Sequence, residues 1–482
     1  MLLLIFLAGF LLLSRITLKN SLLERLGFAL PTGLASITLV MILMDWGNIG
    51  LTRTSLSIAT AGVLIVALAI NCRRYKQFMP HLNNFTLDFK WVNLLWVAIM
   101  GIVVYLEYIN FAKCMVYPVY DRDSLAAFDT IGFVCAQEHT FHAMSIFDPV
   151  YFPHMHEAGS SISYLPMIQL SYAYVYAFGA ATSKAIPAFI YLGFLVGFYG
   201  LCRRKISHTG SALVLLGIIS APEMLAFASL SVTNVMQACM ASSGIVYTCL
   251  WLRDRKSSDL VLAVLLLAIN NWMRAEGIVF IGAAWLMVIV GSLRNKDWRS
   301  ALLPAASLLP LVLWLLYSKS CGLYAESAII AHPYWDGEKA ATIVNGAWSH
   351  FFSGVYYGWT FHLFAIVLVA SIIGRYIISR IRKKSQHTST GSHNYSELLV
   401  PAALLISVIG YYLLLYQVDY KWDSIDNVLA YSAKRFNFCF VPLAWYYIAD
   451  AAPVNRLFTW LEKVLGLGGT VTLRAGKESK NR

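Results

Sequence analysis

The stretch ISYLPMIQLSYAYVYAFGA, residues 162–180, decides how the rest of the chain is threaded. It is apolar enough to cross a bilayer, which takes about 20 residues. If it crossed, the basic clusters that follow it would all lie outside, whereas short inner loops normally carry the excess of Lys and Arg. We therefore predict an interfacial or re-entrant helix over 162–180, a position that suits Pro166 and the tyrosine-rich face. A simple crossing is the alternative, and it would make one of the short predicted spans false.

The composition of the whole chain is that of a protein embedded in a membrane. Of its 482 residues, 59% are hydrophobic and only 13% are charged, whereas a soluble domain averages about 25% charged. So few charges cannot cover a water-soluble surface of this size. The net charge is +12, but the basic residues sit in short clusters between apolar runs, as inner loops do. This pattern argues against a nucleic-acid partner.

Apolar runs recur along the chain and predict an all-α polytopic membrane protein with about thirteen transmembrane helices. The predicted spans are residues 2–14, 27–47, 55–72, 91–112, 185–202, 210–222, 232–252, 259–272, 277–293, 300–318, 361–379, 398–416 and 436–450. We expect a multi-pass protein of the plasma (inner) membrane, surrounded by membrane lipids.

The spans and basic clusters together predict four regions. Residues 1–112 hold the N-terminal transmembrane helices, and 113–184 form a large outer acidic loop with interfacial helices. Residues 185–453 form a transmembrane core, with outer loops at 319–360 and 417–435. The tail, 454–482, is predicted to lie inside, with an amphipathic stretch and a basic end.

The first outer loop opens with the acidic sequence VYPVYDRDSLAAFD, residues 116–129. Asp121 and Asp123 straddle Arg122, and in an extended segment their side chains would point the same way. Such a pair predicts a general base or a shared divalent cation, Mg²⁺ or Mn²⁺, held by carboxylate oxygens. The alternative is a solvated loop with turn-forming aspartates.

The same loop ends with YFPHMHEAGSSISYLP, residues 151–166. His154 and His156 would face the same side of an extended segment, and a His-x-His pair can bind a transition metal. No strong third or fourth ligand accompanies them in the sequence. Hydrogen bonding at the membrane interface is therefore the favoured role.

Two charged pairs fall at predicted outer helix ends. Arg274 and Glu276, in NNWMRAEGI, lie at the outer mouth between two apolar runs, where a charged pair is costly unless partnered or functional. Anchoring of the helix ends is the alternative. Lys434 and Arg435, in YSAKRFNF, begin the last predicted helix on the side where topology-setting cations are not expected. Such a pair can hold an anionic head group or a phosphate.

These stretches resemble the membrane-embedded GT-C glycosyltransferases, including the relatives of protein mannosyltransferases that use polyprenyl-phosphate sugars. DSLAAF (123–128) resembles the acidic start of that family's first outer loop. HMHEAGSSISYLPMIQLSYAYVYAFG (154–179) resembles the stretch that closes that loop. MRAEGI (273–278) is similar to a lysine–any–glutamate–glycine element, and KRFNFCFVP (434–442) is a weaker match to a late arginine-led helix.

The chain departs from the family pattern at Phe128, Arg274 and Asn234, where relatives commonly have tryptophan, lysine and aspartate. The resemblance implies a GT-C-like fold and an inverting transfer on the outer, periplasmic or extracytoplasmic, face in cell-envelope glycan biosynthesis. The donor would be a polyprenyl-phosphate-linked sugar and the acceptor a glycolipid, polysaccharide or protein. It implies Asp123 as the base, with Asp121 as second choice. The implied substrate-binding residues are Arg274, Glu276, Lys434, Arg435, His154, His156 and Tyr164.

Two other function classes fit a many-helix protein. A lipid-linked polysaccharide ligase or polymerase tends to place key residues in a late outer loop, and His350 in SHFFSGVYYG is a hint of that kind. A membrane transporter or flippase would carry ionisable residues in mid-helix and paired half-repeats.

Overall fold

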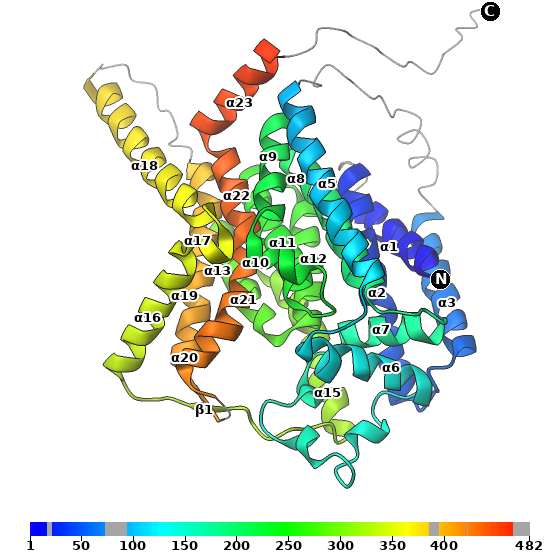
Figure 1. Ribbon diagram of the computed structural model, residues 1–482. Helices are drawn as coiled ribbons and strands as arrows, with labels where there is room; N and C mark the ends of the chain where they lie inside the picture. The colour runs from blue at the N-terminus through cyan, green and yellow to red at the C-terminus, as the bar shows by residue number, and fades with distance from the viewer. Residues whose placement is uncertain (17–21, 73–93, 385–394, 422, 466–482) are drawn as a thin grey trace, which may run out of the picture.

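The computed structural model describes residues 1–16, 22–72, 94–384, 395–421 and 423–465, which are nearly all α-helical (Figure 1). In these residues nine helices are long and apolar enough to cross a membrane, or ten if one bent pair counts as a span. The nine are α2 (Leu22–Trp46), α3 (Arg53–Cys72), α5 (Leu94–Val116), α8 (Ala185–Cys202), α11 (Asn234–Asp254), α13 (Ile278–Asn295) with its preceding turn, α14 (Trp298–Leu302) with α15 (Leu309–Ser320), α18 (Thr360–Lys384) and α19 (Leu399–Tyr416). The protein is a multi-pass membrane protein.

The other four predicted spans hold shorter helices, so the count of thirteen stays a prediction. They are α1 (Leu2–Ile16), α9 (His208–Ile219), α12 (Ser257–Met273) and α22 (Phe440–Asp450). The α9 helix breaks before Pro222 and continues at an angle of 76° as α10 (Pro222–Ala228). Proline lacks a backbone N–H and its ring clashes with the preceding turn, which explains the break.

Residues 162–180 do not form a spanning helix. They contain α7 (Met167–Ala177), whose 11 residues rise about 16 Å, roughly half of the hydrocarbon thickness. Left-handed Gly179, with a φ of 83°, follows its end. In Figure 1, α7 runs across the bundle beside α6 (Asp129–Glu138). The tyrosines of α7 were expected at the membrane interface. Tyr172 and Tyr174 are instead fully buried inside the protein.

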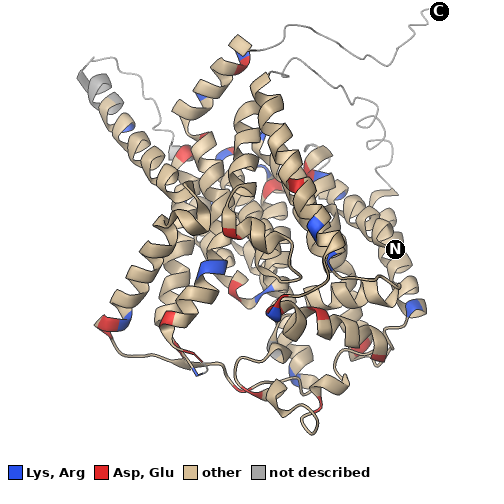
Figure 2. Cartoon of the chain, viewed as in Figure 1, with Lys and Arg blue, Asp and Glu red and all other residues tan. Residues whose placement is uncertain are grey.

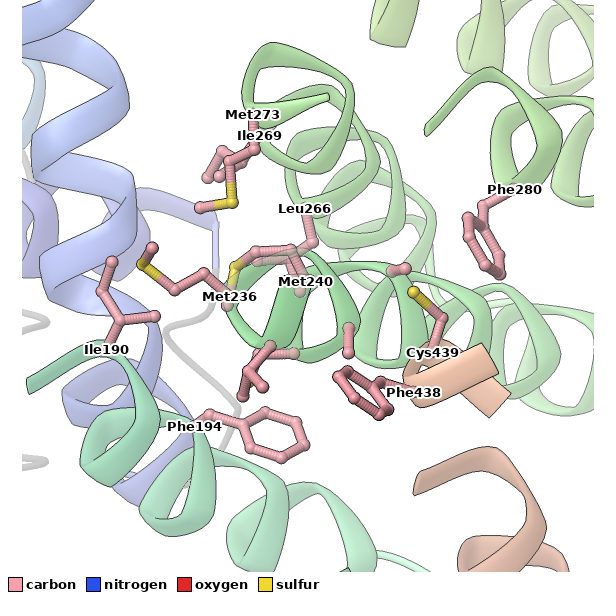
Figure 3. Packing of buried hydrophobic residues seen from close by; sticks show 14 of the residues in the cluster. Ile190, Phe194, Met236, Met240, Leu266, Ile269, Met273, Phe280, Phe438 and Cys439 are labelled. Carbon is pink, nitrogen blue, oxygen red and sulfur yellow. The ribbon is translucent and has the colours of Figure 1, made fainter. Parts of the chain in front are cut away.

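The core is built around α11, in which every residue from Asn234 to Trp251 is buried. A helix that is covered on all sides lies at the centre of a bundle. Figure 3 shows Met236 and Met240 of α11 between Ile190 and Phe194 of α8 on one side and Leu266 and Ile269 of α12 on the other. The charged positions are sparse along the long helices, as Figure 2 shows.

The second and third outer loops are joined by the one small sheet in the described residues. Strand β1 (Ile329–Ala331) pairs antiparallel with β2 (Val418–Tyr420), with Ile330 opposite Asp419. Helices α16 (Gly337–Phe352) and α17 (Gly354–Tyr357) follow β1 in the chain, and α20 (Ile425–Val428) and α21 (Lys434–Phe436) follow β2. At the opposite end of the bundle lies α23 (Ala452–Leu465) (Figure 1). The sheet fixes the two loops that carry His350 and the 434–435 cations relative to one another.

Helices α2 and α8 approach so closely that only glycine fits between them. A Cβ atom on Gly27 would lie 2.3 Å from the Cα atom of Gly197 and 2.4 Å from the carbonyl oxygen of Gly193. Small residues allow such contacts between membrane helices. We expect Gly27→Val to lower the stability of the detergent-purified protein by about 3 kcal/mol, seen as a lower melting temperature.

Gly62 of α3 is the matched control, because a Cβ atom there meets nothing within 4 Å. Gly62→Val should melt like the unchanged protein. Equal melting temperatures for the two variants would contradict the close α2–α8 contact.

Candidate functional site

The first outer loop is anchored by a buried aspartate at the end of α2. The carboxylate of Asp45 accepts hydrogen bonds from the backbone N–H of Phe141 (2.8 Å) and of His142 (3.1 Å), and the His142 ring Nδ1 lies 2.7 Å away. The hydroxyl of Tyr317, from α15, donates to the same carboxylate. These bonds fix the middle of the loop, at Phe141 and His142, against the bundle.

Asp123 forms an ion pair with Arg435, a residue more than three hundred positions away in the chain. The arginine donates to the Asp123 carboxylate, and its guanidinium also lies 5.4 Å from the centre of the Phe227 ring. The Asp123 side chain is 44% exposed, so the carboxylate is held in place and still accessible. Both partners adjoin single π-helical turns, η2 (Ser124–Phe128) and η9 (Leu429–Ala433). Such turns occur frequently at functional sites.

Asp121 has a different position from the one expected from an extended segment. The helical conformation begins at Arg122, and the Asp121 carboxylate accepts hydrogen bonds from the N–H groups of Asp123 (3.1 Å) and Ser124 (3.2 Å). The expectation that two aspartates of an extended strand point the same way was therefore wrong, because Asp121 caps a helix start. In the part of the chain that the structure describes, no group of three or more His, Cys, Asp or Glu side chains converges as a metal site would.

Arg274 and Glu276 pair with one another between α12 and α13. The guanidinium donates twice to the carboxylate, from Nε at 3.1 Å and from Nη2 at 2.7 Å, in the two-pronged geometry that makes such pairs strong. A third donation, at 3.3 Å, reaches the hydroxyl of Thr233 just before α11. The pair thus joins the α12–α13 turn to the start of the central helix.

Tyr164 is close enough to both ion pairs for their charges to act on its hydroxyl. Desolvation raises the pKa of its hydroxyl, and the charge of Arg274 opposes that rise, with weaker effects from Glu276, Asp123 and Arg435. Its ring stacks on that of Phe128, with the two ring centres 5.9 Å apart. The four charged residues that act on Tyr164 are all among the site residues expected from the sequence.

Lys434 adds a second cation beside this group. Its ammonium donates to the Glu223 carboxylate at 2.9 Å and lies 4.8 Å from the centre of the Tyr356 ring. His350 is close to the same pair: burial lowers its pKa, and the Lys434 charge lowers it further while Glu223 opposes the change. Glu223 and Tyr356 were absent from the sequence prediction. Pro222 indicated only that a helix begins beside Glu223, since proline often occupies the first helical position.

The two loop histidines do not join the ion pairs. His154 is exposed and its ring lies 6.0 Å from that of Phe152. The ring nitrogens of His156 lie 2.8 Å from the carbonyl oxygen of Tyr324 and 3.0 Å from that of Phe147. The contact with Tyr324 ties the first outer loop to the second, and hydrogen bonding is the role that was favoured from the sequence.

Comparisons with protein-family models, with curated proteins and with solved structures found no match for this chain. The function proposed for it therefore rests on the geometry of the ion pairs described above.

Proposed function

We propose that this protein is an integral membrane glycosyltransferase that transfers a sugar from a polyprenyl-phosphate donor to an acceptor hydroxyl at the outer face. The observation that carries the proposal is the accessible Asp123 carboxylate held directly by Arg435, with the Arg274–Glu276 pair close to the same tyrosine. The GT-C resemblance of the sequence supports the same assignment.

The chemistry needs one base and a group of cations. Asp123 takes the proton from the acceptor hydroxyl as the acceptor oxygen attacks the anomeric carbon of the sugar. The bond between that carbon and the phosphate oxygen breaks, and its electron pair stays on the lipid phosphate, which gains one negative charge. Arg435 and Lys434 stabilise that charge. Single displacement inverts the anomeric configuration, with a glycolipid, polysaccharide or protein as acceptor.

We infer that Arg435 exchanges partners when the donor binds. Arg435 now neutralises Asp123, and a donor phosphate brought to Arg435 competes for the same guanidinium. Binding of the donor thereby loosens the hold on Asp123 and leaves the carboxylate available as a base. Arg274 and Glu276, already paired, are assigned to positioning of the substrate next to Tyr164.

A transfer assay in proteoliposomes tests the proposal. The purified chain is supplied with a set of polyprenyl-phosphate sugars and with membrane acceptors, and the release of polyprenyl phosphate is measured. We expect release to depend on the protein and on the acceptor. Movement of an unchanged lipid across the bilayer without release would favour a flippase instead.

One observation favours transport as the second candidate function. Glu107 lies within α5 and is 6% exposed, and its Oε1 atom has no hydrogen-bond partner among the described residues. Its Oε2 atom accepts only a 3.3 Å bond from Asn110. Ionisable groups inside membrane spans often mark ion or proton pathways. Glu107→Gln should leave sugar transfer within a few-fold of the unchanged protein and should abolish uptake if the protein is a transporter.

A substitution of His350 distinguishes the transferase hypothesis from the ligase or polymerase hypothesis. Because burial and Lys434 lower its pKa, His350 is neutral near pH 7 and has the protonation state of a base. Under our proposal Asp123 is the base, so we expect His350→Ala to lower turnover by less than about 10-fold, well below the loss of a general base. Loss of all activity in this variant, with activity kept in Asp123→Asn, would establish the ligase reading.

A further inference from the structure

A cavity of about 430 Å³ lies beneath α23, at the end of the bundle opposite β1 and α20. Its volume falls within the range of small-ligand sites, about 300–1,000 Å³. Four cations and two carboxylates line it, so its formal charge is positive. The cations are Lys205, Arg253, Arg456 and Lys463, and the carboxylates are Glu397 and Asp450. The cavity shares no residue with the outer ion pairs.

Both carboxylates of this cavity already have an arginine partner. Arg253 donates to Asp450 at 2.8 Å, and Arg375 donates to Glu397 at 2.5 Å. By contrast, Arg456 and Lys463 form no ion pair with any carboxylate in the described parts of the chain. The excess positive charge of the cavity therefore comes from Arg456 and Lys463 of α23. A bound anion would neutralise it.

Helix α23 holds these cations beside an exposed apolar face. Arg456, Trp460 and Lys463 are spaced i, i+4, i+7, so all three lie on one side of the helix and all line the cavity. Leu457, Trp460 and Val464 are each more than half exposed. An amphipathic helix with cations, leucine and tryptophan is typical of a segment lying in the membrane interface.

The position of α23 is fixed by the bundle. Asn455 donates to the carbonyl oxygen of Lys205 at 2.9 Å and accepts from the N–H of Ser207 at 3.1 Å. The N–H of Thr209 donates to Glu462 at 2.6 Å. These bonds hold α23 against the α8–α9 turn, so the cavity between them has a fixed position.

We propose that this cavity binds the phosphate of an anionic phospholipid in the inner leaflet. The phosphate lies against Arg456 and Lys463, and the acyl chains lie along Leu457 and Val464. A free phosphate ion would use the same cations but would gain nothing from the apolar residues. The exposed apolar face and Trp460 in the cavity wall favour the lipid. This site is independent of the glycosyl transfer proposed above.

Lipid binding to the purified full chain tests the proposal. Native mass spectrometry in detergent would measure dissociation constants for dioleoylphosphatidylglycerol and for zwitterionic dioleoylphosphatidylcholine. Each basic residue near an anionic lipid contributes about 1 kcal/mol, so Arg456→Gln with Lys463→Gln should weaken phosphatidylglycerol binding about 30-fold. Phosphatidylcholine binding should change little.

The matched control removes two other exposed basic residues near a predicted inner helix connection, Arg294→Gln in the last turn of α13 with Arg299→Gln in α14. It lowers the net charge equally and should keep phosphatidylglycerol binding. Equal losses in the two double variants would overturn the site, because binding would then follow net charge alone. Inorganic phosphate that competes fully at millimolar concentration would overturn the lipid assignment. Since the readout is lipid binding, neither result depends on whether the protein transfers sugars.

Discussion

Replacing Asp123 by Asn should lower the rate of sugar transfer by at least about 100-fold while the protein still inserts and folds. Asn has nearly the same shape as Asp, and the side chain is 44% exposed, so little packing is disturbed. It cannot take up the acceptor proton, and it no longer forms an ion pair with Arg435. The measurement is the initial rate of polyprenyl phosphate release, with the melting temperature and elution profile recorded in parallel.

Asp121→Asn provides the control in the same loop. Asp121 accepts hydrogen bonds at the helix start, and Asn is an equally good residue at that position. This variant removes one negative charge two residues before Asp123, and we expect its activity to stay within a few-fold of that of the unchanged protein. Full activity of Asp123→Asn would exclude Asp123 as the base. A large loss in Asp121→Asn alone would move that role to Asp121.

Replacing Arg435 by Gln should weaken binding of polyprenyl phosphate, the expected product, about 10- to 100-fold. A hydrogen bond to a charged group is worth about 1.5–3 kcal/mol, which corresponds to that range. Binding is measured by titration of the lipid phosphate into the detergent-purified protein. Arg299→Gln, an exposed arginine outside the site, removes the same charge and should bind normally.

The double variant Asp123→Asn with Arg435→Gln separates a structural from a functional role. If Arg435 served only to neutralise Asp123, removing both partners would restore the melting temperature and the lipid affinity together. Under our proposal the melting temperature recovers and the affinity does not, because the phosphate still lacks its arginine. Recovery of both quantities would show that the ion pair is purely structural.

The helices could be predicted from the sequence because the bilayer imposes a simple rule. Apolar runs must be helical where no water is present to satisfy the backbone. Residues 162–180 were the hardest case, and the helix that they contain, α7, is not among those long enough to cross a membrane. The bend between α9 and α10 was not predicted. The sequence stays apolar up to Pro222, but the helix axis changes direction there.

The charged residues of the candidate site could be predicted from the sequence, but the ion pairs that they form could not. Costly ions at helix ends pointed to Arg274, Glu276, Lys434 and Arg435, because such groups are rare near a membrane unless they are partnered or functional. The pairing of Asp123 with Arg435 depends on how distant helices pack, and no local pattern reports that. The capping role of Asp121 depends on where the backbone turns helical, which D-x-D alone does not determine.

The separation of Asp123 and Arg435 also has a consequence for biosynthesis. The two residues are 312 positions apart, and ribosomes add roughly 5–20 residues per second, so the aspartate precedes its partner by roughly 15 to 60 s. During that interval the first outer loop is already synthesised, with its carboxylate uncompensated. The site is completed only by one of the last segments to enter the membrane. A chain truncated before residue 434 would therefore keep most of its helices and would leave Asp123 without its arginine partner.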